Sequence, residues 1–264
     1  MTESSSQATV DRAHFVFATA TLLFALLAHA VAYLVHEYTH SLMAWSLGWM
    51  SEPFGINYGP ATFSNVILLG DVDDNVKYST IFAGGHGPSA AVIALAGPFV
   101  GNGALYFLLY AIASRSALMS RRYLLMFIYW LSLMCAANVW SYVPIRAITT
   151  HADIALGARG FGVSVWTLFP FVMAVSGFIT WHFFARMFAK AHAQIAKGSV
   201  VNLAVVIAFT AFWYFSFFGA AGIDGSYGLV SQILSIASRY VLFPLCVAFL
   251  SGTYLRSSMR ETRT

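Results

Sequence analysis

The pentapeptide His36-Glu37-Tyr38-Thr39-His40 has residue types and a spacing that suit metal chemistry. On a helix, two histidines four positions apart project from one face with about 5–6 Å between their Cβ atoms, so both can reach one metal ion. A glutamate next to the first histidine then flanks the metal as a general base. The spacing predicts one zinc ion held by His36 and His40, with Glu37 as the catalytic base.

This motif lies in an apolar segment, where Glu37 is the only formally charged residue between Arg12 and Glu52. A charged side chain at membrane depth costs about 2.5–3.5 kcal/mol even on lenient scales, so a chain that keeps one usually uses it.

Hydrophobic residues make up 59% of the 264 residues and charged residues 9%, far below the roughly 25% charged of soluble domains. The composition predicts an all-α polytopic membrane protein in contact with the lipid bilayer. Nucleic acid is not an expected partner, because the basic residues form no patch.

Six apolar stretches approach or exceed the roughly 20 residues that a membrane-spanning helix needs. They are residues 13–48, 87–113, 122–143, 161–188, 199–219 and 229–255. We expect a membrane core over 13–160, three additional transmembrane helices over 161–256, and polar tails at 1–12 and 257–264, the first of them frayed. Ala28-His29-Ala30 resembles a signal-peptide cleavage site, but the apolar run continues through Val35, which favours a retained span.

The insert over residues 49–86 differs in composition from the spans. Residues 52–69 alternate β-branched and aromatic residues with Gly55, Gly59 and Pro60, which predicts two short strands around a turn, a β-hairpin-like insert between the first two spans. Such a hairpin could pair with an extended peptide by β-augmentation. An ordinary surface loop is the alternative. The acidic run Gly70-Asp71-Val72-Asp73-Asp74-Asn75 is expected to be a solvated turn.

The distribution of basic residues predicts that both termini face the cytoplasm, because that side then carries most of the arginine and lysine. The residues on that side are Arg12, Arg115, Arg121, Arg122, Arg186, Lys190, Lys197, Arg256, Arg260 and Arg263, against Lys77, Arg146 and Arg159 on the other. Arg239 falls inside the sixth span. It is either a functional intramembrane charge or a sign that this span begins near Tyr240.

Three segments together resemble the site-2 protease family of intramembrane zinc metalloproteases. They are the apolar helix that runs through the pentapeptide into Ser41-Leu42-Met43-Ala44, then Ala96-Gly97-Pro98 with Asn102 nearby, and then Asn138 and Pro144 leading to Asp153. The resemblance implies a protease with one zinc ion per chain, Asp153 as third ligand, and transmembrane segments of other membrane proteins as substrates. Much of that family works from the cytoplasmic side, whereas the charge distribution places the motif end of the first span on the opposite side.

The third zinc ligand can also be sought from chemistry alone. A catalytic zinc site usually has three protein ligands and an open position for water. Asp153 follows the third span directly, in a segment that returns toward the membrane, and is preferred over the neighbouring His151.

Several polar residues are candidates for supporting roles. Asn102 and Asn138 could hydrogen-bond a substrate carbonyl or the developing oxyanion. His29 lies seven residues before His36, on nearly the same helix face, and could tune the site; a packed histidine is the alternative. His86 could contact substrate or be a loop histidine. Gly97 and Gly101 form a small-xxx-small pair that predicts close packing of the second span against the first.

Two other classes of function remain open. The first is a catalytically silent membrane protein with a closed, four-ligand metal site. The second is a metal transporter or a metal-dependent oxygenase that uses additional histidines. The sequence has no clustered histidine boxes, and its last three spans offer few polar residues besides Arg239, so a protease is favoured.

Overall fold

The structure, a computed structural model, describes residues 2–146, 148–149 and 152–255 and is built from α-helices. Within these ranges, six helices are long and apolar enough to cross a membrane. In a bilayer the helix satisfies its own backbone hydrogen bonds, which explains why an apolar chain of this kind folds into helices. The predicted fold class, an all-α polytopic membrane protein, is confirmed.

Five of the six spans include short π-helical turns inside or at the end of an α-helix, marked η. The spans are α1 (Thr2–Ser46); α4, η1 and α5 (Gly87–Ala96, Gly97–Ala104, Leu105–Ala113); α7 and η2 (Arg122–Ser141, Tyr142–Arg146); α9, η3 and α10 (Val165–His182, Phe183–Phe188, Ala189–Ala196); α11 and η4 (Val200–Ala211, Phe212–Phe217); and α12, η5, α13 and η6 (Leu229–Ala237, Ser238–Leu242, Phe243–Leu250, Ser251–Leu255). The short helices are α2 (Phe63–Leu68), α3 (Tyr78–Ala83), α6 (Ser116–Met119) and α8 (Asp153–Phe161).

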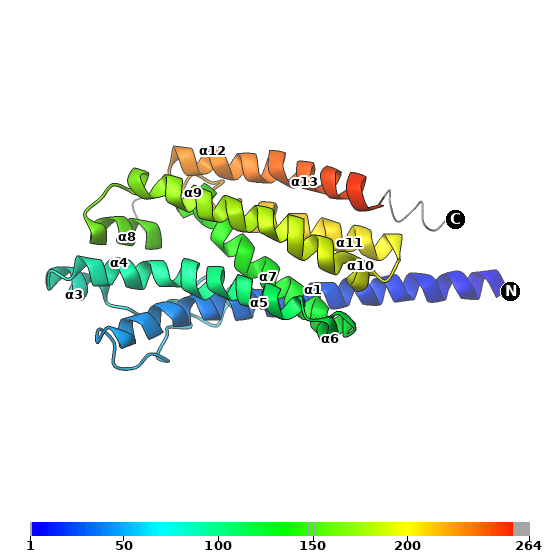
Figure 1. The fold of residues 1–264 in the computed structure, drawn as a ribbon, viewed down its shortest axis with the longest axis horizontal. Helices are drawn as coiled ribbons and strands as arrows, with labels where there is room; N and C mark the ends of the chain where they lie inside the picture. The colour runs from blue at the N-terminus through cyan, green and yellow to red at the C-terminus, as the bar shows by residue number, and fades with distance from the viewer. Residues whose placement is uncertain (1, 147, 150–151, 256–264) are drawn as a thin grey trace.

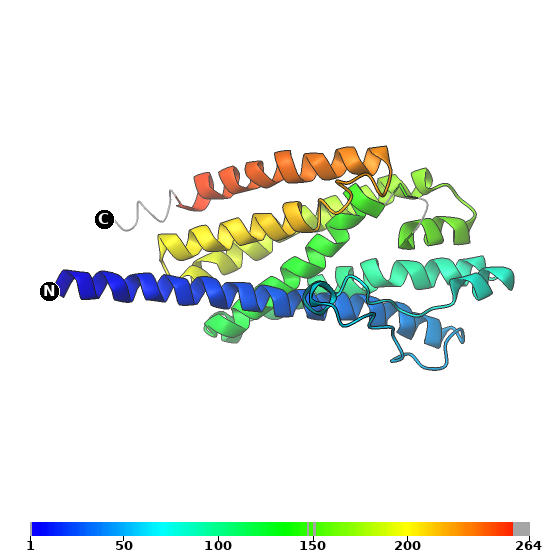
Figure 2. The same cartoon turned by 180° about the vertical axis from the view of Figure 1, so that it is seen from behind.

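The long helices form an elongated bundle in which α7 crosses the centre (Figure 1). Most side chains of α7 are buried, including Trp130 and Tyr129, and they form the core with residues of α1, α5, α10 and α11. The beginning of α1 and the end of α13 lie at one end of the bundle, whereas α3, α8 and the beginning of α12 lie at the other end (Figures 1 and 2). The helix α8, which begins at Asp153, therefore lies at the end of the bundle opposite the beginning of α1.

The N-terminal part of α1 differs from the expected frayed tail. The helix begins at Thr2 and continues without interruption to Ser46. The expected C-terminal tail, residues 257–264, lies outside the described residues. The sixth span is also continuous from Leu229 to Leu255, so Arg239 lies within the helix and not before its start.

The predicted β-hairpin in residues 52–69 is wrong. Among the described residues there is only an isolated antiparallel bridge, between Asn57 and Asp73, and residues 63–68 form α2 instead. The Thr62 side chain caps α2 by accepting a hydrogen bond from the Asn65 backbone N–H at 3.1 Å. The Asn65 carboxamide donates to the carbonyl oxygens of Tyr58 and Pro60, at 2.8 and 3.0 Å, so side-chain bonds replace a strand ladder.

The insert is fastened to α1 close to the motif. The Ser41 hydroxyl donates to the backbone carbonyl of Asp74 at 2.8 Å. The side chain of Asp74 is buried, whereas Asp71 and Asp73 are exposed. The prediction that this acidic run is a solvated turn is therefore wrong for Asp74, because the contact with α1 removes that side chain from solvent.

Candidate metal centre

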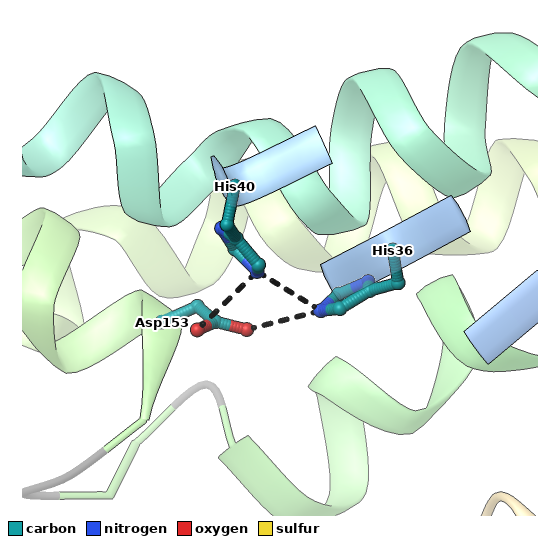
Figure 3. A group of neighbouring side chains, drawn as sticks. All are labelled: His36, His40 and Asp153. Carbon is teal, nitrogen blue, oxygen red and sulfur yellow. Dashed lines mark hydrogen bonds and ion pairs between the residues drawn. The ribbon is translucent and has the colours of Figure 1, made fainter. Parts of the chain in front are cut away.

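His36 and His40 project from one face of α1 toward the carboxylate of Asp153, the first residue of α8 (Figure 3). Nε2 of His36 lies 3.5 Å from Oδ2 of Asp153, and Nε2 of His40 lies 3.8 Å from Oδ1. The two Nε2 atoms are 3.1 Å apart. Two imidazole nitrogens and a carboxylate from three different turns of the chain thus converge on one point, and such a set of nitrogen and oxygen donors suits zinc.

The tautomer of His40 follows from its hydrogen bond. Nδ1 of His40 lies 2.8 Å from the backbone carbonyl oxygen of Ile93, and a carbonyl oxygen can only accept. Nδ1 therefore carries a proton, so Nε2, which faces Asp153, is the nitrogen available to a metal ion. A hydrogen bond to the ring nitrogen that does not bind the metal fixes the orientation of a metal-binding imidazole. Nδ1 of His36, by contrast, is buried and has no hydrogen-bond partner among the described residues.

A glycine allows the second span to reach His40. A Cβ atom on Gly97 would overlap Nε2 of His40, and a Cβ on Gly101 would lie 2.8 Å from Oγ1 of Thr39. The predicted close packing of the second span against the first is confirmed at both glycines. These contacts place η1 against His40 and Thr39 of α1.

Asp153 is positioned by the packing of α8 against α4. A Cβ on Gly157 would lie 3.0 Å from the Leu95 side chain, and the backbones of Gly160 and Gly87 are in direct contact. The small residues let the two helices approach closely and bring the first turn of α8 over the end of α1. The sequence contains these glycines, but no sequence pattern indicates which of them contact one another between α4 and α8.

Tyr142 and Arg146, one turn apart in η2, support Asp153. The Tyr142 hydroxyl donates a short hydrogen bond to Oδ2 of Asp153 and lies 3.2 Å from Nε2 of His36. Nη1 of Arg146 donates to the Tyr142 hydroxyl at 2.9 Å and lies 3.9 Å from Oδ2 of Asp153. Burial opposes ionisation of Asp153, but the facing His40 and His36 and the Arg146 charge outweigh it and hold the pKa of its carboxyl well below the usual range.

A polar cavity of about 360 Å³ opens beside these residues and is the candidate active-site cavity. Glu37 lines it together with His36, His40 and Asp153. The general base and the metal-binding atoms therefore share one cavity.

Asp74 and Tyr78 form another wall of this cavity. Burial raises the pKa of the Asp74 carboxyl to about 6, although nearby His40 opposes the shift, and Oδ2 accepts a hydrogen bond from the Tyr78 hydroxyl at 3.1 Å. Asp74 forms a second possible ligand group with Glu37 and His40, with Oδ2 at 4.0 Å from Nδ1 of His40. Because Nδ1 already donates to Ile93, this second group lacks a free imidazole lone pair.

The other predicted site residues are more dispersed. Asn102 is fully buried in η1, lines neither this cavity nor the one beside it, and its carboxamide has no hydrogen-bond partner among the described residues. Asn138 and His29 line the neighbouring cavity. His86 is exposed with its ring 4.9 Å from that of Trp49, and His151 lies outside the described residues.

Sequence reasoning missed the roles of Asp74, Tyr142 and Arg146. Arg146 was counted only as a charge that orients the membrane spans. Its position seven residues before Asp153, at the end of an apolar span, is the signal that could have identified it.

Comparison with known proteins gives no relative: no family model, curated protein or solved structure matches the chain. The class that the fold and the geometry of the described residues define is a six-span helical membrane protein with a cluster of two buried histidines and a half-buried aspartate.

Proposed function

We propose that the protein is an intramembrane zinc metalloprotease of the site-2 protease type, which hydrolyses peptide bonds in or near transmembrane segments of other membrane proteins. The single observation that carries this proposal is the convergence of His36, His40 and Asp153 on the cavity that Glu37 also lines. Two imidazoles, one carboxylate and a second carboxylate as base form a donor set of metallopeptidase type.

Each residue of the site has its own role in the proposed peptide hydrolysis. His36, His40 and Asp153 would hold zinc, which when bound supplies an acidified water and polarises the scissile carbonyl. Glu37 accepts the proton of the attacking water and returns it to the leaving amine. Arg146 also lines the cavity, and its positive charge, 3.9 Å from Asp153, keeps that ligand carboxylate ionised.

Access to the cavity fits a membrane substrate. The cavity is lined partly by α1 and α8 and partly by insert residues such as Val72 and Val76, at the end of the bundle where the spans emerge. A substrate helix must unwind there to present its backbone. The insert is therefore proposed to act on substrate selection.

The decisive experiment combines zinc analysis with the substitution Glu37→Gln in the purified full chain in nanodiscs. We expect one zinc per chain in both forms and a decrease of about 10²–10⁴-fold in cleavage of single-span peptides in the variant. Glu52→Gln, at an exposed glutamate outside the cavity, is the matched control. Unchanged cleavage in Glu37→Gln excludes the protease proposal, and a wild-type protein that binds no zinc excludes the metalloenzyme proposal.

One observation favours the silent metal-binding protein as a second candidate. The Tyr142 hydroxyl contacts both His36 and Asp153, so it could close the metal site as a fourth ligand. In that case wild-type protein binds zinc without cleaving peptides, and Tyr142→Phe opens the fourth position and creates activity. Activity in wild type with no gain in Tyr142→Phe excludes this candidate.

A further inference from the structure

A second cavity, also of about 360 Å³, lies beside the candidate active site. The two cavities share three lining residues, Tyr33, Gly70 and Arg146. The second cavity is further lined by residues of α1, α7, η5 and the segment that follows η4, among them His29, Asn138 and Arg239. It therefore extends from the candidate metal centre toward the sixth span, with a wall that combines apolar and polar side chains.

The charge in this cavity is positive. Arg146 and Arg239 line it, and no aspartate or glutamate does. Arg146 is partly balanced by Asp153, 3.9 Å away, but no carboxylate of the described chain lies within 4.0 Å of the Arg239 guanidinium. Arg239 donates instead to the hydroxyl and carbonyl oxygens of Ser216, at 3.2 and 3.1 Å. A cation in an apolar helix without a counter-ion is a site where an anion is strongly favoured.

The cavity wall also contains acceptor atoms that receive no hydrogen bond from the described residues. Nε2 of His29 lies 2.9 Å from the carbonyl oxygen of Leu68 and must donate to it, so Nδ1 is an acceptor. This Nδ1 and Oδ1 of Asn138 are both buried, and neither has a partner among the described residues. Buried polar atoms without partners are rare in folded proteins and mark places where a water or ligand completes the bonding. A ligand that offers both a carboxylate and N–H groups matches this wall.

We propose that this cavity binds a carboxylate of the peptide substrate through Arg239 and Arg146, while the backbone N–H groups of the same peptide face His29 and Asn138. The inference rests on the proposed protease function and adds a specificity site to it. His29 precedes His36 by seven residues on α1, about 10.5 Å of helical rise. That distance is about three residues of extended chain, and His29 lines the same cavity as the two arginines, so we place the carboxylate about three residues from the scissile bond.

The carboxylate can come from the C-terminus of the peptide or from an aspartate or glutamate side chain. Four synthetic single-span peptides separate these sources: one with a free C-terminus three residues from the cleavage site, its C-terminal amide, one with an internal glutamate at that position, and its glutamine counterpart. The ratio of kcat/KM between each acid and its amide is the measurement. We expect at least one ratio to exceed about tenfold, because the loss of one charge-assisted hydrogen bond changes kcat/KM by about this factor.

The substitution Arg239→Gln tests the cavity directly. It should reduce the acid-to-amide ratio to near one, whereas Arg239→Lys, which keeps the charge, retains part of the preference. Arg186→Gln is the matched control, because Arg186 is exposed and lines neither cavity. A general loss of folding lowers the rates for acid and amide together, so it leaves the ratio unchanged. Ratios near one in the wild-type protein, or an unchanged ratio in Arg239→Gln, overturn the inference.

A measurement of peptide binding distinguishes a failure of this inference from a failure of the proposed function. Titration calorimetry of the same four peptides against Glu37→Gln protein measures affinity without cleavage. If wild type cleaves peptides but neither cleavage nor binding prefers an acid, the inference is wrong and the protease proposal stands. If no peptide is cleaved but acids bind at least about tenfold tighter than amides through Arg239, the carboxylate site stands and the protease proposal falls. Absence of any acid-dependent binding overturns the inference in every case.

Discussion

The backbone of Gly97 lies against the imidazole of His40, so a side chain at position 97 would overlap Nε2 of that histidine. Nε2 is the nitrogen that the bond from Nδ1 to Ile93 leaves free for a metal ion. The same glycine therefore allows the second span to pack closely against α1 and leaves space for the metal-binding nitrogen of His40. Any residue larger than glycine at this position displaces His40.

Gly97→Ala should abolish high-affinity zinc binding. The added methyl group pushes the imidazole away from His36 and Asp153, and overpacking lowers the stability of the fold by about 1–3 kcal/mol. Zinc content and thermal unfolding of the purified variant are the measurements. Gly177→Ala, in α9 with open space around a Cβ, is the control and should bind zinc like wild type. Normal zinc binding by Gly97→Ala would show that the contact with His40 is not tight.

The third ligand can be identified by comparing Asp153→Asn with Asp74→Asn. Asp153 faces both Nε2 atoms, whereas Asp74 lies beside Nδ1 of His40, which is already engaged by Ile93. We expect zinc affinity to fall by more than about 100-fold in Asp153→Asn and by less than about tenfold in Asp74→Asn. Competition with a chromophoric chelator measures both values. The reverse order would assign the metal to the group formed by Glu37, His40 and Asp74.

Tyr142→Phe should weaken the metal centre without unfolding the protein. The phenyl ring keeps the packing of η2, but the hydrogen bond to Asp153 and the partner of Arg146 are lost. Removal of such an outer partner typically lowers metal affinity or activity by about 10–100-fold. Zinc affinity and cleavage rate should therefore fall together while the unfolding temperature of the apo protein changes little. Equal affinity in variant and wild type would mean that Asp153 is held by other contacts.

Membrane orientation is tested by cysteine labelling at two exposed residues, Lys77, directly before α3, and Gln194, in α10. The helices α3 and α10 lie at opposite ends of the bundle (Figure 1). In a background in which Cys135 and Cys246 are replaced by alanine, an impermeant maleimide should reach position 194 from the cytoplasmic side. Position 77 should react only from the opposite side, as the distribution of basic residues predicts. Labelling of position 77 from the cytoplasm would reverse the predicted topology.

The membrane spans could be predicted from sequence because length and apolarity alone decide whether a helix can cross a bilayer. The proximity of His36 and His40 was also predictable, since helical geometry sets it within one turn. The hairpin prediction for residues 52–69 failed for a physical reason. Asn65 bonds to carbonyl oxygens five and seven residues away, and local strand preference contains no information about such bonds.

The sequence by itself therefore determined a helical membrane protein with a two-histidine, one-glutamate motif in its first span. Only the tertiary structure decided which groups complete that motif. Asp153 reaches the histidines because glycine contacts lay α8 on α4, and Tyr142 and Arg146 reach Asp153 because η2 turns them toward it. Asn138, a candidate for binding the substrate carbonyl or the oxyanion, lines the second cavity with Arg239. The positions of His40 and Asp153 depend on contacts between residues more than 50 positions apart, which spacing along the chain does not encode.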